Sequence, residues 1–128
     1  MDPQVREFVQ TAARDLIGLD VALFFQANPS VFDSASGLAL RLHWKAEDLE
    51  PAIERLVACG VLEAFTRGGG RYRCYALSSE PTVWHLLCAL CEAYLDEPET
   101  RKEIVRLLVR EMHSDHLSKP PGPGAATS

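Results

Sequence analysis

Residues 47–77, EDLEPAIERLVACGVLEAFTRGGGRYRCYAL, constrain the fold of this chain more than any other segment. Apolar residues recur at helical spacing in its first part, and Gly60 suits the left-handed position at which such a helix ends. Two apolar and aromatic stretches, VLEAF and RYRCYAL, then flank the glycine-rich segment TRGGG, which predicts a β-hairpin. The segment therefore predicts a helix that packs beside a two-stranded ribbon.

The helix in this segment has a well-defined apolar side. Its inward residues are Leu49, Ile53, Leu56 and Val57. Because proline inside a helix removes a hydrogen bond and clashes with the preceding turn, Pro51 predicts that the helix begins or bends near Asp48. A shorter helix, capped by Ser34 or Ser36, precedes it across a turn at residues 43–45. The inward side of this shorter helix is predicted to consist of Leu38, Ala39 and Leu42.

Helices are also predicted on both sides of this core. Asp2 and Pro3 are typical of a helix start, and Gly18 is expected to end that first helix. A second helix is predicted from Asp20 to about residue 27, where an Asn-Pro-Ser sequence interrupts it.

Two further helices follow the hairpin. Pro81 begins one that runs to about Leu95, and a stop with a fresh capping box at residues 96–99 begins the last. Residues 114–128, SDHLSKPPGPGAATS, have the composition of a disordered tail. With 128 residues in all, the chain is long enough for one domain, which we expect to span residues 1–113.

The stretch LALRLHWKAEDLEPAIERLVACGVLEAF, followed by the hairpin, resembles the winged helix-turn-helix of bacterial MarR- and ArsR-like transcription regulators. In that family the corresponding helix often ends in a leucine, a small residue and a glycine before the strand. The resemblance implies a mainly α fold with a small β-hairpin (α+β), in which a winged helix-turn-helix core at about residues 20–78 carries flanking N- and C-terminal helices. It also implies a transcription regulator that binds double-stranded DNA.

The charges give two opposed indications about DNA. The net charge of −5 argues against general adhesion to nucleic acid, and residues 45–59, which the resemblance places in the major groove, carry four carboxylates against Lys45 and Arg55. The hairpin is basic, and phosphates attract such a surface. The predicted DNA-binding residues are Arg41, Lys45, Arg67, Arg71 and Arg73. The alternative is a protein–protein interaction module on a winged-helix scaffold that no longer binds DNA.

The cysteines and histidines offer a further candidate site. His85, Cys88 and Cys91 are potential metal ligands, but steps of three residues drift around a helix, so one ion would not easily reach all three. Cysteine is also a common small buried apolar residue, and we therefore expect neither a metal nor another cofactor. The sequence holds no nucleophile elbow, and TRGGG lacks the lysine and following helix of a phosphate-binding loop. These features predict a protein that is not an enzyme.

The helix at residues 80–95 is apolar almost all round, which indicates burial on several sides. We therefore expect a homodimer through the terminal helices. No signal peptide or membrane-spanning segment is recognisable, which predicts a cytoplasmic protein without a membrane partner.

Overall fold

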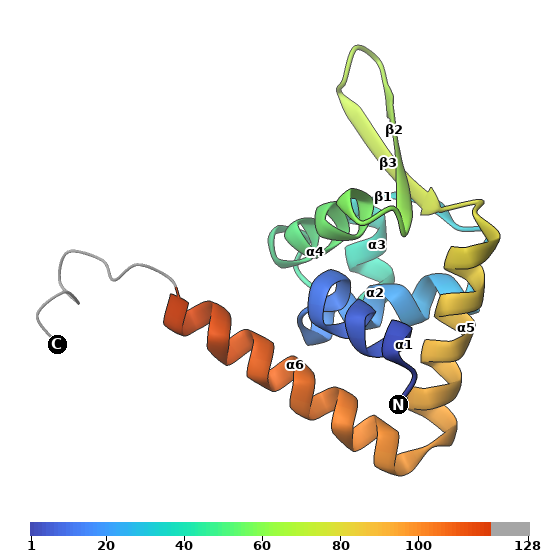
Figure 1. The fold of residues 1–128 in the computed structure, drawn as a ribbon. Helices are drawn as coiled ribbons and strands as arrows, with labels where there is room; N and C mark the ends of the chain where they lie inside the picture. The colour runs from blue at the N-terminus through green and yellow to red at the C-terminus, as the bar shows by residue number, and fades with distance from the viewer. Residues whose placement is uncertain (119–128) are drawn as a thin grey trace, which may run out of the picture.

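In the computed structural model, which describes residues 1–118 and the side chains of residues 1–110, a small antiparallel sheet lies at one end of a helical body, and its hairpin projects outward (Figure 1). The elements in chain order are α1 (Pro3–Phe8), the π-helix η1 (Val9–Ala13), α2 (Leu16–Ala27), β1 (Phe32–Ser34), α3 (Ala35–Leu42), α4 (Ala46–Ala58), β2 (Leu62–Arg67), β3 (Tyr72–Leu77), α5 (Pro81–Asp96) and α6 (Pro98–Ser118). The predicted fold class, mainly α with a small β-component, is confirmed.

The sheet has the strand order β1-β3-β2, and both pairs are antiparallel. The predicted hairpin is its larger part, with Leu62 opposite Leu77 at the base and Arg67 opposite Tyr72 near the tip. Strand β1 was not predicted. It has three residues, Phe32 to Ser34, which are too few to show a strand pattern, and it forms by pairing with β3 far along the chain.

Helices α3 and α4 form the predicted helix-turn-helix. Ser34 caps α3 by accepting a hydrogen bond from the N–H of Gly37 at 3.2 Å, and His43 ends it in a left-handed conformation. The helix α4 begins at Ala46, two residues before the predicted start near Asp48, because the N–H groups of Asp48 and Leu49 both donate to the carbonyl of Lys45. Pro51 is accommodated within α4 on its exposed side.

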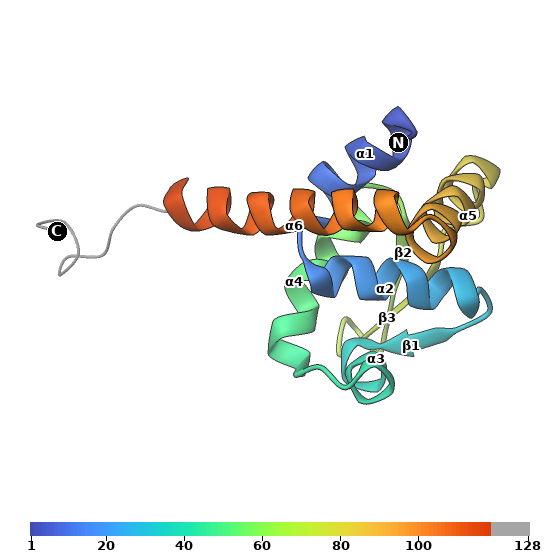
Figure 2. The same cartoon turned by 90° about the horizontal axis from the view of Figure 1, so that it is seen from below.

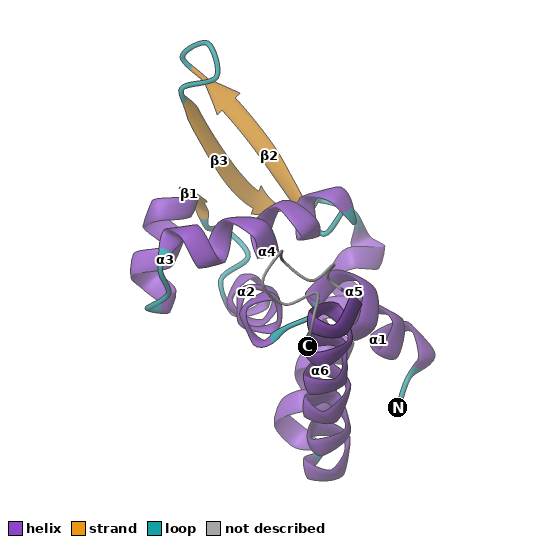
Figure 3. Cartoon of the chain, turned by 90° about the vertical axis from the view of Figure 1, so that its left-hand side faces the viewer, coloured by secondary structure: helices purple, strands orange, loops and turns teal. Residues whose placement is uncertain are grey.

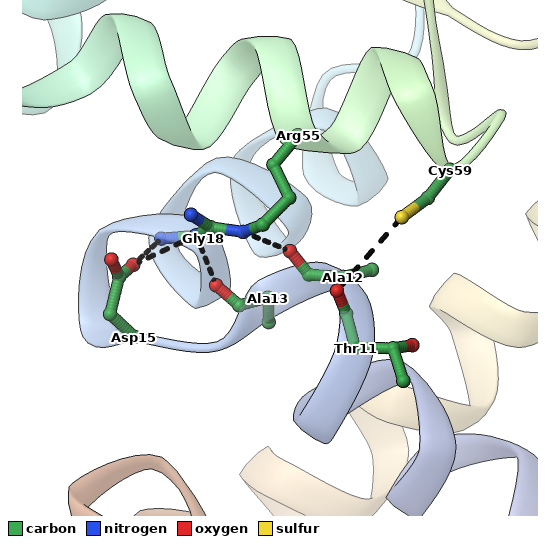
Figure 4. Close-up of polar contacts among 7 residues, drawn as sticks. All are labelled: Thr11, Ala12, Ala13, Asp15, Gly18, Arg55 and Cys59. Carbon is green, nitrogen blue, oxygen red and sulfur yellow. Dashed lines mark hydrogen bonds and ion pairs between the residues drawn. The ribbon is translucent and has the colours of Figure 1, made fainter. Parts of the chain in front are cut away.

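The N-terminal helices differ from the predicted arrangement. The first helical segment ends at Ala13, and Arg14 follows with a φ of 60°. Gly18 does not end it but lies in the first turn of α2, where its N–H donates to the Asp15 carboxylate at 2.7 Å. A Cβ at Gly18 would lie 2.0 Å from the carbonyl oxygen of Ala13, so glycine is required for close approach (Figure 4). The prediction of a helix start at Asp20 was also wrong, because α2 already begins at Leu16 and includes Gly18.

The core lies mainly among the helices, and Leu62 and Tyr75 join it from the sheet. The predicted inward side of α4 is confirmed, because Leu49, Ile53 and Leu56 are fully buried and Val57 packs at their margin. The largest other fully buried side chains come from α2, α3, α5 and α6, and are Phe25, Leu19, Leu38, Leu87, Leu90, Ile104 and Leu108. One core therefore joins the helix-turn-helix to the flanking helices.

The flanking helices lie on the side of the body away from the hairpin. Figure 2, seen from below, shows α6 running alongside α2, with α5 at one end. An ion pair between Arg6 and Glu103 joins α1 to α6. Helix α5 buries Leu87, Leu90 and Ala93, whereas Leu95 is 56% exposed, so its apolar circumference is covered only in part. Helix α6 runs to Ser118, beyond the predicted start of the tail, and residues 119–128 lie outside the described part of the chain.

Candidate nucleic-acid interface

The hairpin of β2 and β3, residues 62–77, is called the wing here because it projects beyond the helices (Figures 1 and 3). Its tip consists of Gly68, Gly69 and Gly70, with φ values of 60°, 69° and 90°, a left-handed run that other residues rarely adopt. Arg67 and Arg71 flank these glycines and are exposed. Within residues 1–110, neither guanidinium has a hydrogen bond or an ion pair with another side chain.

Arg73 has a different environment. Its Nε and Nη2 donate to the two carboxylate oxygens of Glu54 on α4, at 2.7 and 2.9 Å, and the Tyr75 hydroxyl donates to Glu54 Oε1 at 2.7 Å. The guanidinium also lies over the Tyr75 ring, 5.6 Å from its centroid. These three side chains join the wing to α4, and a phosphate would compete with Glu54 for the donors of Arg73.

The electrostatics of this cluster follow from its hydrogen bonds. The hydrogen bonds from Arg73 lower the pKa of Glu54 against the opposing effect of burial, and the hydrogen bond from Tyr75 lowers it further. The hydrogen bond to Glu54 raises the pKa of Arg73. Burial raises the pKa of Tyr75 to about 12, and its hydrogen bond to the Glu54 carboxylate adds to the effect. The cluster is therefore an ion pair with a neutral phenol at neutral pH.

The two other predicted cations lie near the helix-turn-helix. Arg41 on α3 pairs with Asp33 on β1, with Nε 3.2 Å from Oδ2, and its side chain remains 54% exposed. Lys45, the residue before α4, is exposed and has no side-chain partner within the described part of the protein. The structure thus divides the predicted DNA-binding residues into a paired group, Arg41 and Arg73, and an unpaired group, Lys45, Arg67 and Arg71.

The outward side of α4 is acidic. Glu47, Asp48 and Glu50 are exposed on its first turns. Arg55, the other cation of this helix, turns inward, and its Nε and Nη2 donate to the carbonyls of Ala12 and Ala13 at 2.8 and 2.6 Å (Figure 4). The surface of α4 that a winged helix would present to a major groove therefore carries carboxylates rather than donors.

The sheet carries an exposed aromatic pair that was not predicted from the sequence. Phe32 on β1 and Phe65 on β2 are 47% and 42% exposed, with ring centroids 5.4 Å apart. The alternation Glu63, Phe65, Arg67 along β2 is a signal for this placement, because alternate residues of a strand share a face. The pairing with Phe32 required β1, which the sequence did not predict.

The structure also places the predicted metal candidates. Among the described residues, no group of three or more His, Cys, Asp or Glu side chains is arranged to hold a metal ion, and this includes His85, Cys88 and Cys91. All four cysteines are free, and burial raises the pKa of the Cys91 thiol, with nearby Asp96 adding to the effect. Over residues 1–118, no helix is both long and apolar enough to cross a bilayer.

Comparison with known proteins gives a match of fold. No protein-family model matches the chain, and no curated protein sequence matches it. The structure is similar to that of a possible transcriptional regulator from Methanosarcina mazei Go1, with a TM-score of 0.52 and 17% sequence identity. The similarity covers 76% of this chain and 85% of that one. At this level of identity the likeness concerns the fold, a mostly helical chain with a small antiparallel sheet.

Proposed function

We propose that the protein is a non-enzymatic winged-helix regulator that binds duplex DNA by phosphate contacts from its wing. The observation that supports this is the pair Arg67 and Arg71 on either side of a glycine tip, two exposed cations with no side-chain partner among the described residues. Guanidinium groups suit phosphate oxygens because their donors match two oxygens at once. The similarity of fold to a possible transcriptional regulator agrees with this function.

The contact is to phosphates rather than to base edges. Base recognition in a major groove relies mostly on Arg, Lys, Asn and Gln, whereas α4 presents Glu47, Asp48 and Glu50 on its exposed side. Those carboxylates keep α4 away from the phosphates that line a groove. Binding by the wing and Lys45 alone is therefore expected to be weak, tolerant of sequence and sensitive to salt.

Fluorescence anisotropy with labelled duplexes of unrelated sequence tests the proposal. Three phosphate contacts predict a slope of about −2 to −3 for log K against log salt concentration. Arg67→Glu and Arg71→Glu should each weaken binding by about tenfold at low salt, since each replaces an attraction with a repulsion. The matched control is Arg106→Glu on α6, an exposed charge reversal away from the wing, which should leave binding unchanged. Absence of binding at about 50 mM salt, where phosphate contacts are strong, contradicts the proposal.

The acidic side of α4 favours a second candidate, a protein-interaction module that docks a basic partner surface. Its carboxylates Glu47, Asp48 and Glu50 are exposed together at the start of a helix. This candidate predicts no DNA binding at low salt but measurable binding of a lysine-rich peptide. That binding should be lost in the double variant Glu47→Lys, Glu50→Lys and kept in Arg71→Glu, the reverse of the pattern expected for DNA.

A further inference from the structure

Strand β2 has an open edge. Within residues 1–118 the strand order β1-β3-β2 leaves nothing hydrogen-bonded to its outer side. Its residues from Glu63 to Arg67 are exposed or half-buried, and Figure 3 shows the wing standing clear of the helices. An edge of this kind offers unpaired N–H and C=O groups to another strand.

The register of the wing identifies which groups the open edge offers. The N–H of Ser78 donates to the carbonyl of Val61 at 3.0 Å, and bonded and non-bonded pairs alternate along an antiparallel ladder. The residues of β2 whose main chains bond to β3 are therefore Glu63, Phe65 and Arg67. The residues whose N–H and C=O groups point outward are Leu62, Ala64 and Thr66.

The residues of β2 whose main-chain groups point to the open edge have side chains that face the core, and the residues bonded to β3 have side chains on the outer face. Leu62 is buried and Ala64 half-buried, opposite the buried Tyr75, so these side chains face the core. The side chains on the outer face of the sheet are therefore Glu63, Phe65 and Arg67. Along this face an acid, an aromatic ring and a base follow one another, with the ring at the centre and opposite charges at equal distances from it.

We propose that two copies of the protein dimerise by antiparallel pairing of their β2 strands, about a two-fold axis at Phe65. In this register Glu63 lies opposite Arg67 of the partner subunit, and the symmetry repeats that pair on the other side of the axis. The two Phe65 rings face each other, and the outward main chains of Ala64 and Thr66 exchange hydrogen bonds with those of the partner subunit. These outward groups are the ones that β3 leaves free.

The neighbouring registers are less favourable. Moving the axis by one residue along β2 in either direction sets Phe65 of one copy opposite a charged side chain of the partner, Glu63 or Arg67. Both opposite-charge pairs are then lost, and such cross-strand pairs stabilise a sheet when they lie directly opposite. The charge pattern of β2 therefore complements itself in one register.

The glycine tip is compatible with this arrangement. In an antiparallel pair the tip of each wing lies beside the base of the other, where the core of the partner begins. Gly68, Gly69 and Gly70 have no side chains, so the tip is narrow where the two copies approach. The contact is small compared with a standard protein interface, and weak association is expected, with dissociation constants in the micromolar range or above.

Dimerisation does not depend on DNA binding, since every group that it uses belongs to this chain. Arg67 takes part in both proposals, however, so a duplex would compete with the partner subunit for that side chain. The test is therefore made without DNA, and its failure would leave the proposed DNA contact through Arg71 and Lys45 open to its own test.

Sedimentation equilibrium at rising protein concentration, at low salt, tests the pairing by charge reversal. Glu63→Arg and Arg67→Glu should each lower the association constant by at least about tenfold, because each turns two attractive cross-strand pairs into repulsive ones. The double variant, with the charges exchanged, should recover association close to that of the wild type. Arg106→Glu, an exposed charge reversal on α6 away from the wing, is the matched control and should have no effect.

A main-chain variant tests the same contact independently. Thr66→Pro removes an N–H that points to the open edge, so it should abolish association while the hydrogen bonds between β2 and β3 remain. Circular dichroism and thermal melting show whether each variant stays folded. A wild type that is monomeric into the millimolar range overturns the proposal. A dimer that the single charge reversals leave intact also overturns it, because the contact would then lie elsewhere, as on the terminal helices. A double variant that fails to recover association overturns it as well.

Discussion

The guanidinium of Arg73 and the carboxylate of Glu54 form a two-pronged ion pair, with N–O distances of 2.7 and 2.9 Å, that joins the wing to α4. Both side chains are 43% exposed, so water screens the attraction between them. The pair holds a cation of the wing against the helix that a winged-helix protein would present to DNA. It also places Glu54 among the residues that fix the angle of the wing.

Replacing Glu54 tests that role. Glu54→Gln should lower the free energy of unfolding at neutral pH, because the charged acceptor for Arg73 and Tyr75 is lost. The folded-state pKa of Glu54 is lowered, so its contribution is present above the ordinary value of about 4.3 and is lost as pH falls through the folded-state value. Urea unfolding of both proteins between neutral and acidic pH should show the difference shrinking on the acidic side. A difference that does not depend on pH would contradict the ion pair.

Tyr75 provides a spectroscopic report of the same cluster. Burial and the Glu54 carboxylate raise the pKa of its phenol to about 12, so its ring signals should remain those of the neutral form through pH 10 and 11. In Glu54→Gln the pKa of Tyr75 should fall, because a neutral amide no longer disfavours the phenolate, while the effect of burial remains. Alkaline titration by NMR measures both values, with Tyr75→Phe to assign the signals. Equal titration midpoints of Tyr75 in the two proteins would mean that the Glu54 carboxylate does not influence the pKa of Tyr75.

Arg55 is expected to be a structural cation. It donates to the carbonyls of Ala12 and Ala13 at the end of η1 and lies 3.4 Å from the Asp15 carboxylate, with its side chain 23% exposed (Figure 4). Arg55→Ala should lower the free energy of unfolding by about 2 kcal/mol, since carbonyls at a helix end lose a charged donor. Denaturant unfolding measures this, with Arg106→Ala on the exposed side of α6 as the control. A loss no larger than the control's would mean that water replaces Arg55 at no cost.

Much of the fold was predictable because its signals are local. The spacing of Leu49, Ile53 and Leu56 and the composition of the wing specify one helix and one hairpin without reference to the rest of the chain. Strand β1 was not predictable in this way, because three residues have no period and become a strand only beside β3. The inward turn of Arg55 toward η1 likewise depends on a helix more than forty positions earlier.

The charges of the candidate site were predictable from the sequence, but the ion pairs that its cations form were not. The sequence predicts a basic hairpin beside an acidic helix, and both are present. It does not show that Arg73 lies within reach of Glu54, or Arg41 within reach of Asp33, because net charge counts cations without their partners. Only the relative placement of wing and helices separates Arg41 and Arg73, which have carboxylate partners, from Lys45, Arg67 and Arg71.

A substitution at Gly18 tests whether glycine is needed there for the close contact between α2 and the end of η1. If Gly18 were an ordinary glycine inside α2 with no close neighbour, Gly18→Ala should stabilise the protein by about 1 kcal/mol through helix propensity. The structure predicts the opposite, a loss of at least about 2 kcal/mol, because the new Cβ would lie against the main-chain carbonyl of Ala13, which Arg55 holds in place. Gly69→Ala at the wing tip is the control: no atom lies within 4 Å of its added Cβ, and only its left-handed φ should cost about 1 kcal/mol. Urea unfolding of the two variants decides between the roles, since a Gly18→Ala protein as stable as the wild type would mean that α2 and η1 do not approach closely there.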